Sequence, residues 1–77
     1  MRHHKSKNIC GVRISQIRTS KKPFISQVKL ATMLQLEGIH MDNKAVYRIE
    51  SGIRRVSDIE LKMIAKLLDV TYDELLN

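Results

Sequence analysis

The side chains best suited to act on another molecule are hydrogen-bond donors in the stretch 42–50, which reads DNKAVYRIE. Apolar residues recur there at helical spacing, so one face of a short helix is expected to be buried. The buried face comprises Ala45, Val46 and Ile49, and the outward face comprises Asn43, Lys44, Tyr47 and Arg48. Asn suits the edge of adenine in the DNA major groove, and Arg and Lys suit guanine. The stretch therefore predicts a helix that contacts base edges of double-stranded DNA.

Other kinds of chemistry have no support in the residue pattern. We find no nucleotide-binding loop, no metal-ligand spacing and no Ser/His/Asp, Cys/His or paired-carboxylate arrangement with a plausible pocket. The adjacent His3 and His4 lack Cys or carboxylate neighbours, and His40 lies in an expected turn. The single Cys10 cannot form an internal disulfide and is expected to be a small buried hydrophobe. We therefore expect no enzyme activity, no metal, no cofactor and no small-molecule substrate.

Charge is distributed unevenly along the chain. Residues 1–55 carry 12 Lys and Arg against 3 Asp and Glu, a net of +9, whereas residues 56–77 carry 2 against 5, a net of −3. This division suits a polyanion on one side and water or a protein on the other. Residues 1–8 lack apolar periodicity, so we expect a flexible basic arm that contacts phosphates or a minor groove once DNA is bound.

The chain has the size and composition of one globular domain, with 77 residues, 43% of them hydrophobic and 29% charged. No apolar run approaches the roughly 20 residues that span a bilayer, and the N-terminus lacks the apolar segment of a signal peptide. We expect a cytoplasmic protein with no membrane partner and a domain over residues 9–77. Because so small a core is marginal, association would add useful buried area.

Five helices are expected, over about 9–20, 27–36, 42–50, 58–68 and 72–76, and no strand pattern competes with them. Four helix starts share a good N-cap residue that follows one apolar residue and precedes another by four positions. These N-caps are Ser26, Asp42, Ser57 and Thr71. Glu60 and Glu74 follow the last two by three residues and complete capping boxes. The predicted fold class is all-α.

Five short stretches then occur in a recognisable order. They are GVRISQIR at 11–18, ISQ followed by LA and L over 25–34, VYRIESG with RR over 46–55, IAKLLDV at 64–70 and DELL at 73–76. Together they resemble the phage-repressor-like (Cro-type, or XRE) helix-turn-helix family, over residues 9–77. The resemblance implies a five-helix, lambda-repressor-like DNA-binding domain whose third helix lies in the major groove.

The resemblance also implies roles for individual residues. Base edges would be contacted by Asn43, Lys44 and Arg48, and Tyr47 would contact a thymine methyl or a phosphate. Further phosphate contacts would come from Ser26, Gln27, Ser51, Arg54 and Arg55. Arg18 and Glu50 would form a partly buried ion pair between the first and third helices.

The chain departs from the family pattern in three places. The turn between the second and third helices, 36–41, is about five residues longer than usual, which bears on the angle between those helices. About two extra residues, including Pro23, lie between Arg18 and Gln27. Ile53 stands where the family commonly has Lys. None of these departures is expected to change the fold.

A second apolar stripe on the helix over 58–68 lies roughly opposite its core face. Its members are Ile59, Met63 and Leu67. The stripe either packs under the N-terminal segment or the last helix, or forms a dimer interface together with Tyr72 and Leu76.

These observations predict a sequence-specific DNA-binding transcriptional regulator, a repressor by resemblance, that acts as a homodimer on a palindromic site. The alternative is an antitoxin or another protein-interaction module whose acidic C-terminal helices bind a protein partner. The salt dependence of DNA affinity separates the two, because only a DNA-binding protein releases counterions from phosphates on binding.

Overall fold

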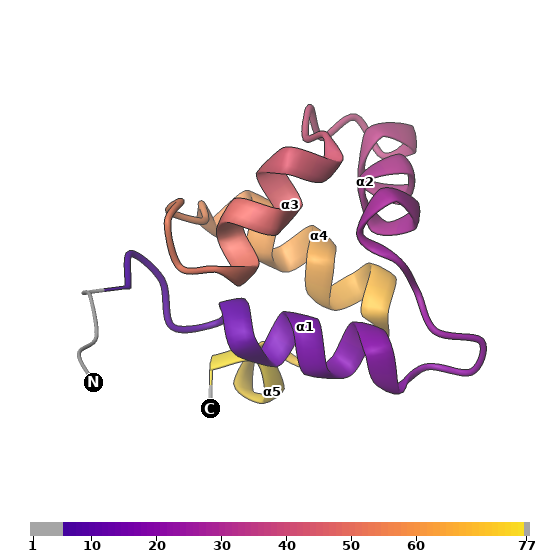
Figure 1. Ribbon diagram of the computed structural model, residues 1–77, viewed down its shortest axis with the longest axis horizontal. Helices are drawn as coiled ribbons and strands as arrows, with labels where there is room; N and C mark the ends of the chain where they lie inside the picture. Colours follow the sequence, from indigo (N-terminus) through magenta and orange to yellow (C-terminus); the bar gives the residue numbers. More distant parts are fainter. Residues whose placement is uncertain (1–5, 77) are drawn as a thin grey trace.

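The computed structural model of the protein describes residues 6–76. As predicted, this part of the chain is all-helical and contains no strand. Its helices are α1 (Gly11–Ser20), α2 (Gln27–Leu36), α3 (Asn43–Glu50), α4 (Asp58–Leu68) and α5 (Tyr72–Leu76). α1 packs against α3 and α5, α2 against α3 and α4, and α4 against α5. Figure 1 shows α2 and α3 together on one side of α1, with α5 near the N-terminal end of α1.

One hydrophobic core draws on all five helices. Its buried members are Cys10, Ile14, Ile17, Leu30, Ala31, Leu34, Met41, Val46, Ile49, Ile64, Ala65, Leu68 and Leu75. Cys10 is 2% exposed, as predicted, and burial raises the pKa of its thiol. Because α3 contributes two of these side chains from its inner face, its rotation about its own axis is fixed by the core.

The helix starts are stabilised as the sequence predicts. Each of the four predicted N-caps accepts a hydrogen bond from the backbone N–H three residues later: Ser26, Asp42, Ser57 and Thr71. The Glu60 carboxylate accepts in return from the Ser57 N–H (3.1 Å), and that of Glu74 from the Thr71 N–H (2.9 Å). These bonds satisfy backbone donors that a helix start leaves unpaired, so the boundaries of α2 to α5 follow from local sequence.

Candidate nucleic-acid interface

The outward face of α3 carries the residues predicted to contact bases. Val46 and Ile49 are 2% and 1% exposed, whereas Ala45, which we expected to be buried, is only partly so. The exposed side chains are Asn43, Lys44, Tyr47 and Arg48. Within residues 6–76, none of these four side chains forms an ion pair or a side-chain hydrogen bond. Their donors are therefore available to a ligand.

The turn from α2 into α3 begins with a tight reversal. Gly38 has a φ of +86°, a left-handed conformation that glycine adopts without strain. The Ile39 N–H then donates to the Leu34 carbonyl (2.9 Å) and the Gly38 N–H to that of Gln35 (3.0 Å). This pair of bonds is a Schellman motif, which satisfies the last carbonyls of α2.

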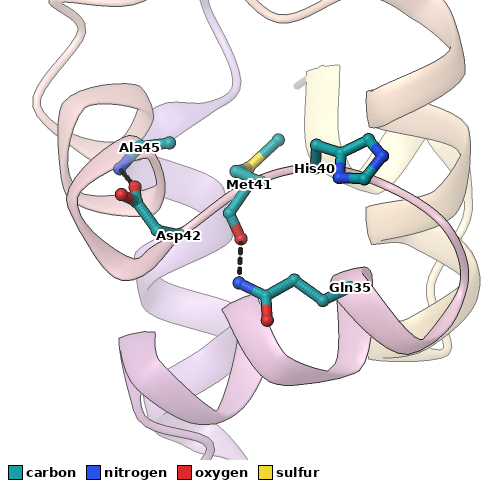
Figure 2. Close-up of a pocket in the computed structure, with 5 residues that line it drawn as sticks. All are labelled: Gln35, His40, Met41, Asp42 and Ala45. Atoms are coloured by element: carbon teal, nitrogen blue, oxygen red, sulfur yellow. Dashed lines mark hydrogen bonds between the residues drawn. The ribbon is translucent and has the colours of Figure 1, made fainter.

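The far end of the same turn is tied back to α2. Gln35 Nε2 donates to the Met41 carbonyl (2.9 Å), and the next residue, Asp42, caps α3 (Figure 2). Met41 is 2% exposed and belongs to the core, whereas His40 is exposed beside the shallow pocket that these residues line. The extended turn predicted over 36–41 is thus held at both ends, which fixes the N-terminal end of α3 relative to α2.

The predicted ion pair between Arg18 and Glu50 is present and holds the other end of α3. Arg18 Nε donates to Glu50 Oε2 (2.7 Å) and Nη2 to Oε1 (2.8 Å), a bidentate arrangement. The third guanidinium nitrogen donates to the Ile25 carbonyl (2.8 Å), and Gln27 Nε2 donates to Glu50 Oε1 (2.9 Å). Arg18 is 7% exposed, so the loss of one partner would leave a buried charge. One carboxylate thereby joins α1, α2 and α3.

Asn8 is a structural residue that the sequence did not reveal. Its Oδ1 accepts from the Gly11 N–H (2.7 Å), and its Nδ2 donates to the carbonyls of Ile49 (3.0 Å) and Arg54 (2.8 Å). The side chain thus joins the start of α1 to the end of α3 and to the loop that follows. α1 was predicted to begin near Ile9 but begins at Gly11, after the turn that Asn8 closes.

The flexible arm was predicted to extend over residues 1–8, and this range is too long at its C-terminal end. Besides the Asn8 contacts, the Lys7 N–H donates to the Gly52 carbonyl (2.8 Å), so both residues belong to the domain. The remaining basic residues assigned to the arm, with His3 and His4, lie outside the described residues.

The residues predicted to contact phosphates occupy two places beside α3. Ser26 and Gln27 are at the start of α2, where unpaired backbone N–H groups and the helix dipole favour an anion. Ser26 accepts from a backbone N–H as the N-cap, and Gln27 commits one amide hydrogen to Glu50. Ser51 and Arg55 follow α3, the first partly buried and the second exposed.

Arg54 differs from this prediction, because its guanidinium is already paired. Both of its terminal nitrogens donate to the carboxylate of Glu60, each at 3.0 Å. Arg54 lowers the pKa of Glu60, mainly through these hydrogen bonds, and Glu60 raises the pKa of Arg54. Arg54 therefore connects the loop after α3 to the start of α4. Of the two neighbouring arginines, Arg55 is the exposed one.

The second apolar stripe is only partly exposed. Met63 and Leu67 are partly buried against the core, so the stripe is not a free face along its whole length. Ile59 is 68% exposed, and Tyr72 and Leu76 are 42% and 40% exposed. The Tyr72 hydroxyl donates to the Asp58 carbonyl (3.4 Å), which brings α5 next to the start of α4.

Comparison with protein families identifies this arrangement. A family model described as Helix-turn-helix matches residues 25–75, from just before α2 to the last residues of α5. The chain belongs to the Cro-like (XRE) helix-turn-helix family. Members of this family are DNA-binding regulatory domains, not catalytic ones, and the protein is a DNA-binding transcription regulator of the XRE type. The comparisons with curated proteins and with solved structures gave no match.

Two further findings concern residues 6–76. No helix there has the length and apolar character needed to cross a membrane. That part of the chain also contains no cluster of three or more His, Cys, Asp or Glu side chains able to hold a metal ion.

α1 precedes the segment that matches the family model, but it is integrated with that segment through Arg18 and Asn8.

Proposed function

We propose that this protein is a sequence-specific repressor that reads the DNA major groove with α3 and binds a palindromic site as a homodimer. In this arrangement Asn43, Lys44 and Arg48 contact base edges, and Tyr47 contacts a thymine methyl or a phosphate. Ser26, Gln27, Ser51 and Arg55 contact phosphates on either side of α3 and set the register. Arg54 contributes mainly by holding its loop.

The observation that carries this proposal is the division of α3 into two faces. The inner face is buried in the core, and the exposed face consists of four donor-bearing side chains without intramolecular partners among the described residues. Most charged helix faces are simply solvated. This face differs because α3 is braced at its N-terminal end by the turn and at its C-terminal end by Glu50. A braced helix can present donors in a fixed geometry, which base recognition requires.

The homodimer part of the proposal rests on exposed apolar side chains and on symmetry. Ile59, Tyr72 and Leu76 are exposed on α4 and α5, whereas the face proposed to contact DNA belongs to α3. Two copies related by a two-fold axis would place their α3 helices in successive major grooves, about 34 Å apart. A palindromic site follows from that symmetry.

The test compares two variants that each remove one positive charge. A preferred duplex is first selected from a random library, and affinities for it and for a random duplex are then measured at several salt concentrations. We expect Arg48→Ala to weaken binding to the selected duplex by about 1–3 kcal/mol and to change random binding much less. Arg55→Ala should weaken both duplexes alike and reduce the slope of log affinity against log salt by about 1.

Two results would contradict the proposal. If Arg48→Ala and Arg55→Ala lose affinity equally on both duplexes, α3 does not read sequence. If the wild-type protein selects no duplex and its affinity is independent of salt, DNA is not the ligand of this surface. Melting temperatures of both variants serve as the control, because both side chains are exposed and should contribute little to stability.

A further inference from the structure

The C-terminal end of α3 is fastened to a segment that precedes α1. Asn8 Nδ2 uses both of its hydrogens on carbonyls far away in the sequence, those of Ile49 in α3 (3.0 Å) and Arg54 in the next loop (2.8 Å). Its Oδ1 accepts from Gly11 at the start of α1 (2.7 Å). Among the residues that the structure describes, no other side chain bonds both to α3 and to the loop after it.

Backbone contacts support the same junction. The Lys7 N–H donates to the Gly52 carbonyl (2.8 Å), between the two carbonyls that Asn8 binds. The loop is also bonded directly to α3, because the N–H groups of Ile53 (2.9 Å) and Arg54 (3.2 Å) both donate to the Arg48 carbonyl. The backbone of Arg54 is thus held between Asn8 and the helix that carries the base-contacting face.

The position of Arg55 relative to α3 depends on this junction. Arg55 directly follows the carbonyl that Asn8 binds, and its side chain is exposed. The guanidinium of Arg54 bonds to Glu60 and to the Arg55 carbonyl, so the loop is fixed on the α4 side as well. Without the Asn8 bonds, the loop would keep its bonds to α4 and its backbone bonds to the Arg48 carbonyl, but it would lose the side-chain link that holds the Arg54 carbonyl beside that of Ile49.

We propose that Asn8 is a positioning residue for DNA recognition: it sets the spacing between the base-contacting face of α3 and the phosphate contact of Arg55. This inference rests on the proposed function and adds a residue that touches neither bases nor phosphates. Phosphate contacts fix the register in which side chains meet base edges, so an Arg55 contact at the wrong distance draws α3 out of register and costs affinity only on the selected duplex. Removal of the Arg55 contact, by contrast, weakens both duplexes alike. Non-specific affinity depends mainly on the number of charges, which Asn8 does not alter.

The test uses Asn8→Ser, which is neutral and can still accept from Gly11 but cannot reach both carbonyls with one hydroxyl. Thr19→Ala is the matched control, because the Thr19 hydroxyl bonds only within α1. Affinities for a selected duplex and a random duplex are measured well below the melting temperature of each variant. We expect the ratio of the two affinities to fall about fivefold or more in Asn8→Ser, comparable with a mild base-pair mismatch, and to be unchanged in Thr19→Ala. The salt slope should not change.

Two further measurements separate positioning from a general loss of stability. Amide hydrogen exchange at Ile53 and Arg54, measured without DNA, should be faster in Asn8→Ser and unchanged in Thr19→Ala. In an Arg55→Ala background, Asn8→Ser should cause a smaller loss on the selected duplex than it does alone, because the two residues act through one contact. If Asn8→Ser does not fold, Asn8→Gln replaces it, because it is also neutral and its amide, one methylene further from the backbone, cannot make the same three bonds.

Two outcomes would overturn the proposal: an unchanged ratio of the two affinities, which includes an equal loss on both duplexes, or additive losses with Arg55→Ala. A wild-type protein that prefers no duplex would refute the proposed function instead. In that case the positioning of the loop is tested separately: an unchanged rate of amide hydrogen exchange at Ile53 and Arg54 in Asn8→Ser would refute it as well.

Discussion

Gly11, at the start of α1, lies directly against the backbone of the end of α3. A Cβ atom at this position would collide with the Ile49 carbonyl oxygen and would lie 3.1 Å from the Cα of Glu50. These are backbone atoms of the helix that carries the proposed base-contacting face, and they cannot rotate away as a flexible side chain can. The absence of a side chain at Gly11 therefore allows Asn8 and Arg18 to hold α3 directly against α1.

Gly11→Ala should therefore destabilise the protein, although alanine is the better helix former. Helix propensity favours alanine by at most about 1 kcal/mol, whereas overpacking a rigid contact costs about 1–3 kcal/mol. We expect a lower free energy of unfolding, measured by urea denaturation. Gln16→Ala, at an exposed position of the same helix, is the control and should change stability little. A Gly11→Ala protein as stable as the wild type would show that α3 can move away from α1 without cost.

At this scale the sequence predicted one of the two ion pairs among the described residues, Arg18–Glu50, but it predicted neither the Arg54–Glu60 pair nor the contacts of Asn8 to distant backbone. Arg18 and Glu50 could be paired from the sequence because their charges are opposite and because they occupy positions that form a pair in the family that the sequence resembles. Asn8 could not, because it follows a basic stretch and its partners are carbonyl groups, which every residue has. Arg54 was assigned to phosphate because the loop after α3 resembles a phosphate-contacting loop of the family, and its real partner, Glu60, had already been assigned to the capping box of α4.

At the start of α4, the side chain of Glu60 has two functions. Glu60 Oε1 accepts from the Ser57 N–H, and the same carboxylate binds Arg54, so it caps α4 and fixes the loop after α3. The helix starts were predictable because a cap and its helix are adjacent in sequence. The path of the long turn before α3 was not, since it depends on Gln35 reaching the Met41 carbonyl and on Met41 entering the core.

Because of this double role, the stability that Glu60 contributes should depend on pH. The direction of that dependence follows from the direction in which the pKa of Glu60 is shifted. Arg54 lowers the pKa of Glu60 in the folded protein below the unperturbed value of 4.5. The stabilisation is therefore complete above the unfolded pKa and is lost as the pH falls through the folded pKa. We expect Glu60→Gln to melt at a lower temperature than the wild type at pH 7, and the difference to shrink on acidification below about pH 4.5.

The exposed Asp73→Asn is the control for this measurement, because Asp73 takes part in neither the cap nor the ion pair. Its melting temperature should follow that of the wild type across the same pH range. A difference between the wild type and Glu60→Gln that stays constant with pH would mean that the ionised form of Glu60 is not what stabilises the start of α4.

Over the whole molecule, the basic and acidic parts of the sequence correspond to different elements. The proposed base-contacting face and Arg55 belong to the basic part, whereas α4 and α5 contain acidic residues, four of them in the first turns of these helices: Asp58, Glu60, Asp73 and Glu74. The sequence predicted this division but not which apolar side chains remain exposed. Met63 and Leu67 lie far enough around α4 to be partly covered, and only the fold shows it.

The proposed dimer surface is therefore Ile59, Tyr72 and Leu76, and Ile59→Glu is its most direct test. Ile59 is 68% exposed, so a charge there should not disturb the fold but would be buried without a partner in the dimer. We expect the variant to sediment as a monomer at concentrations where the wild type is a dimer, and to bind a palindromic duplex more weakly than the wild type. Leu36→Glu, on α2 and 81% exposed, is the sedimentation control and should remain dimeric.

Salt provides a second test of the same surface. Each copy brings the acidic residues of α4 and α5 to the contact, so their repulsion should be screened and the dimer should tighten as salt increases. DNA affinity should fall over the same range, because phosphate contacts release counterions. Opposite responses to salt therefore indicate that the two surfaces are separate. If Ile59→Glu sediments and binds the palindrome as the wild type does, the second copy does not dock on α4 and α5.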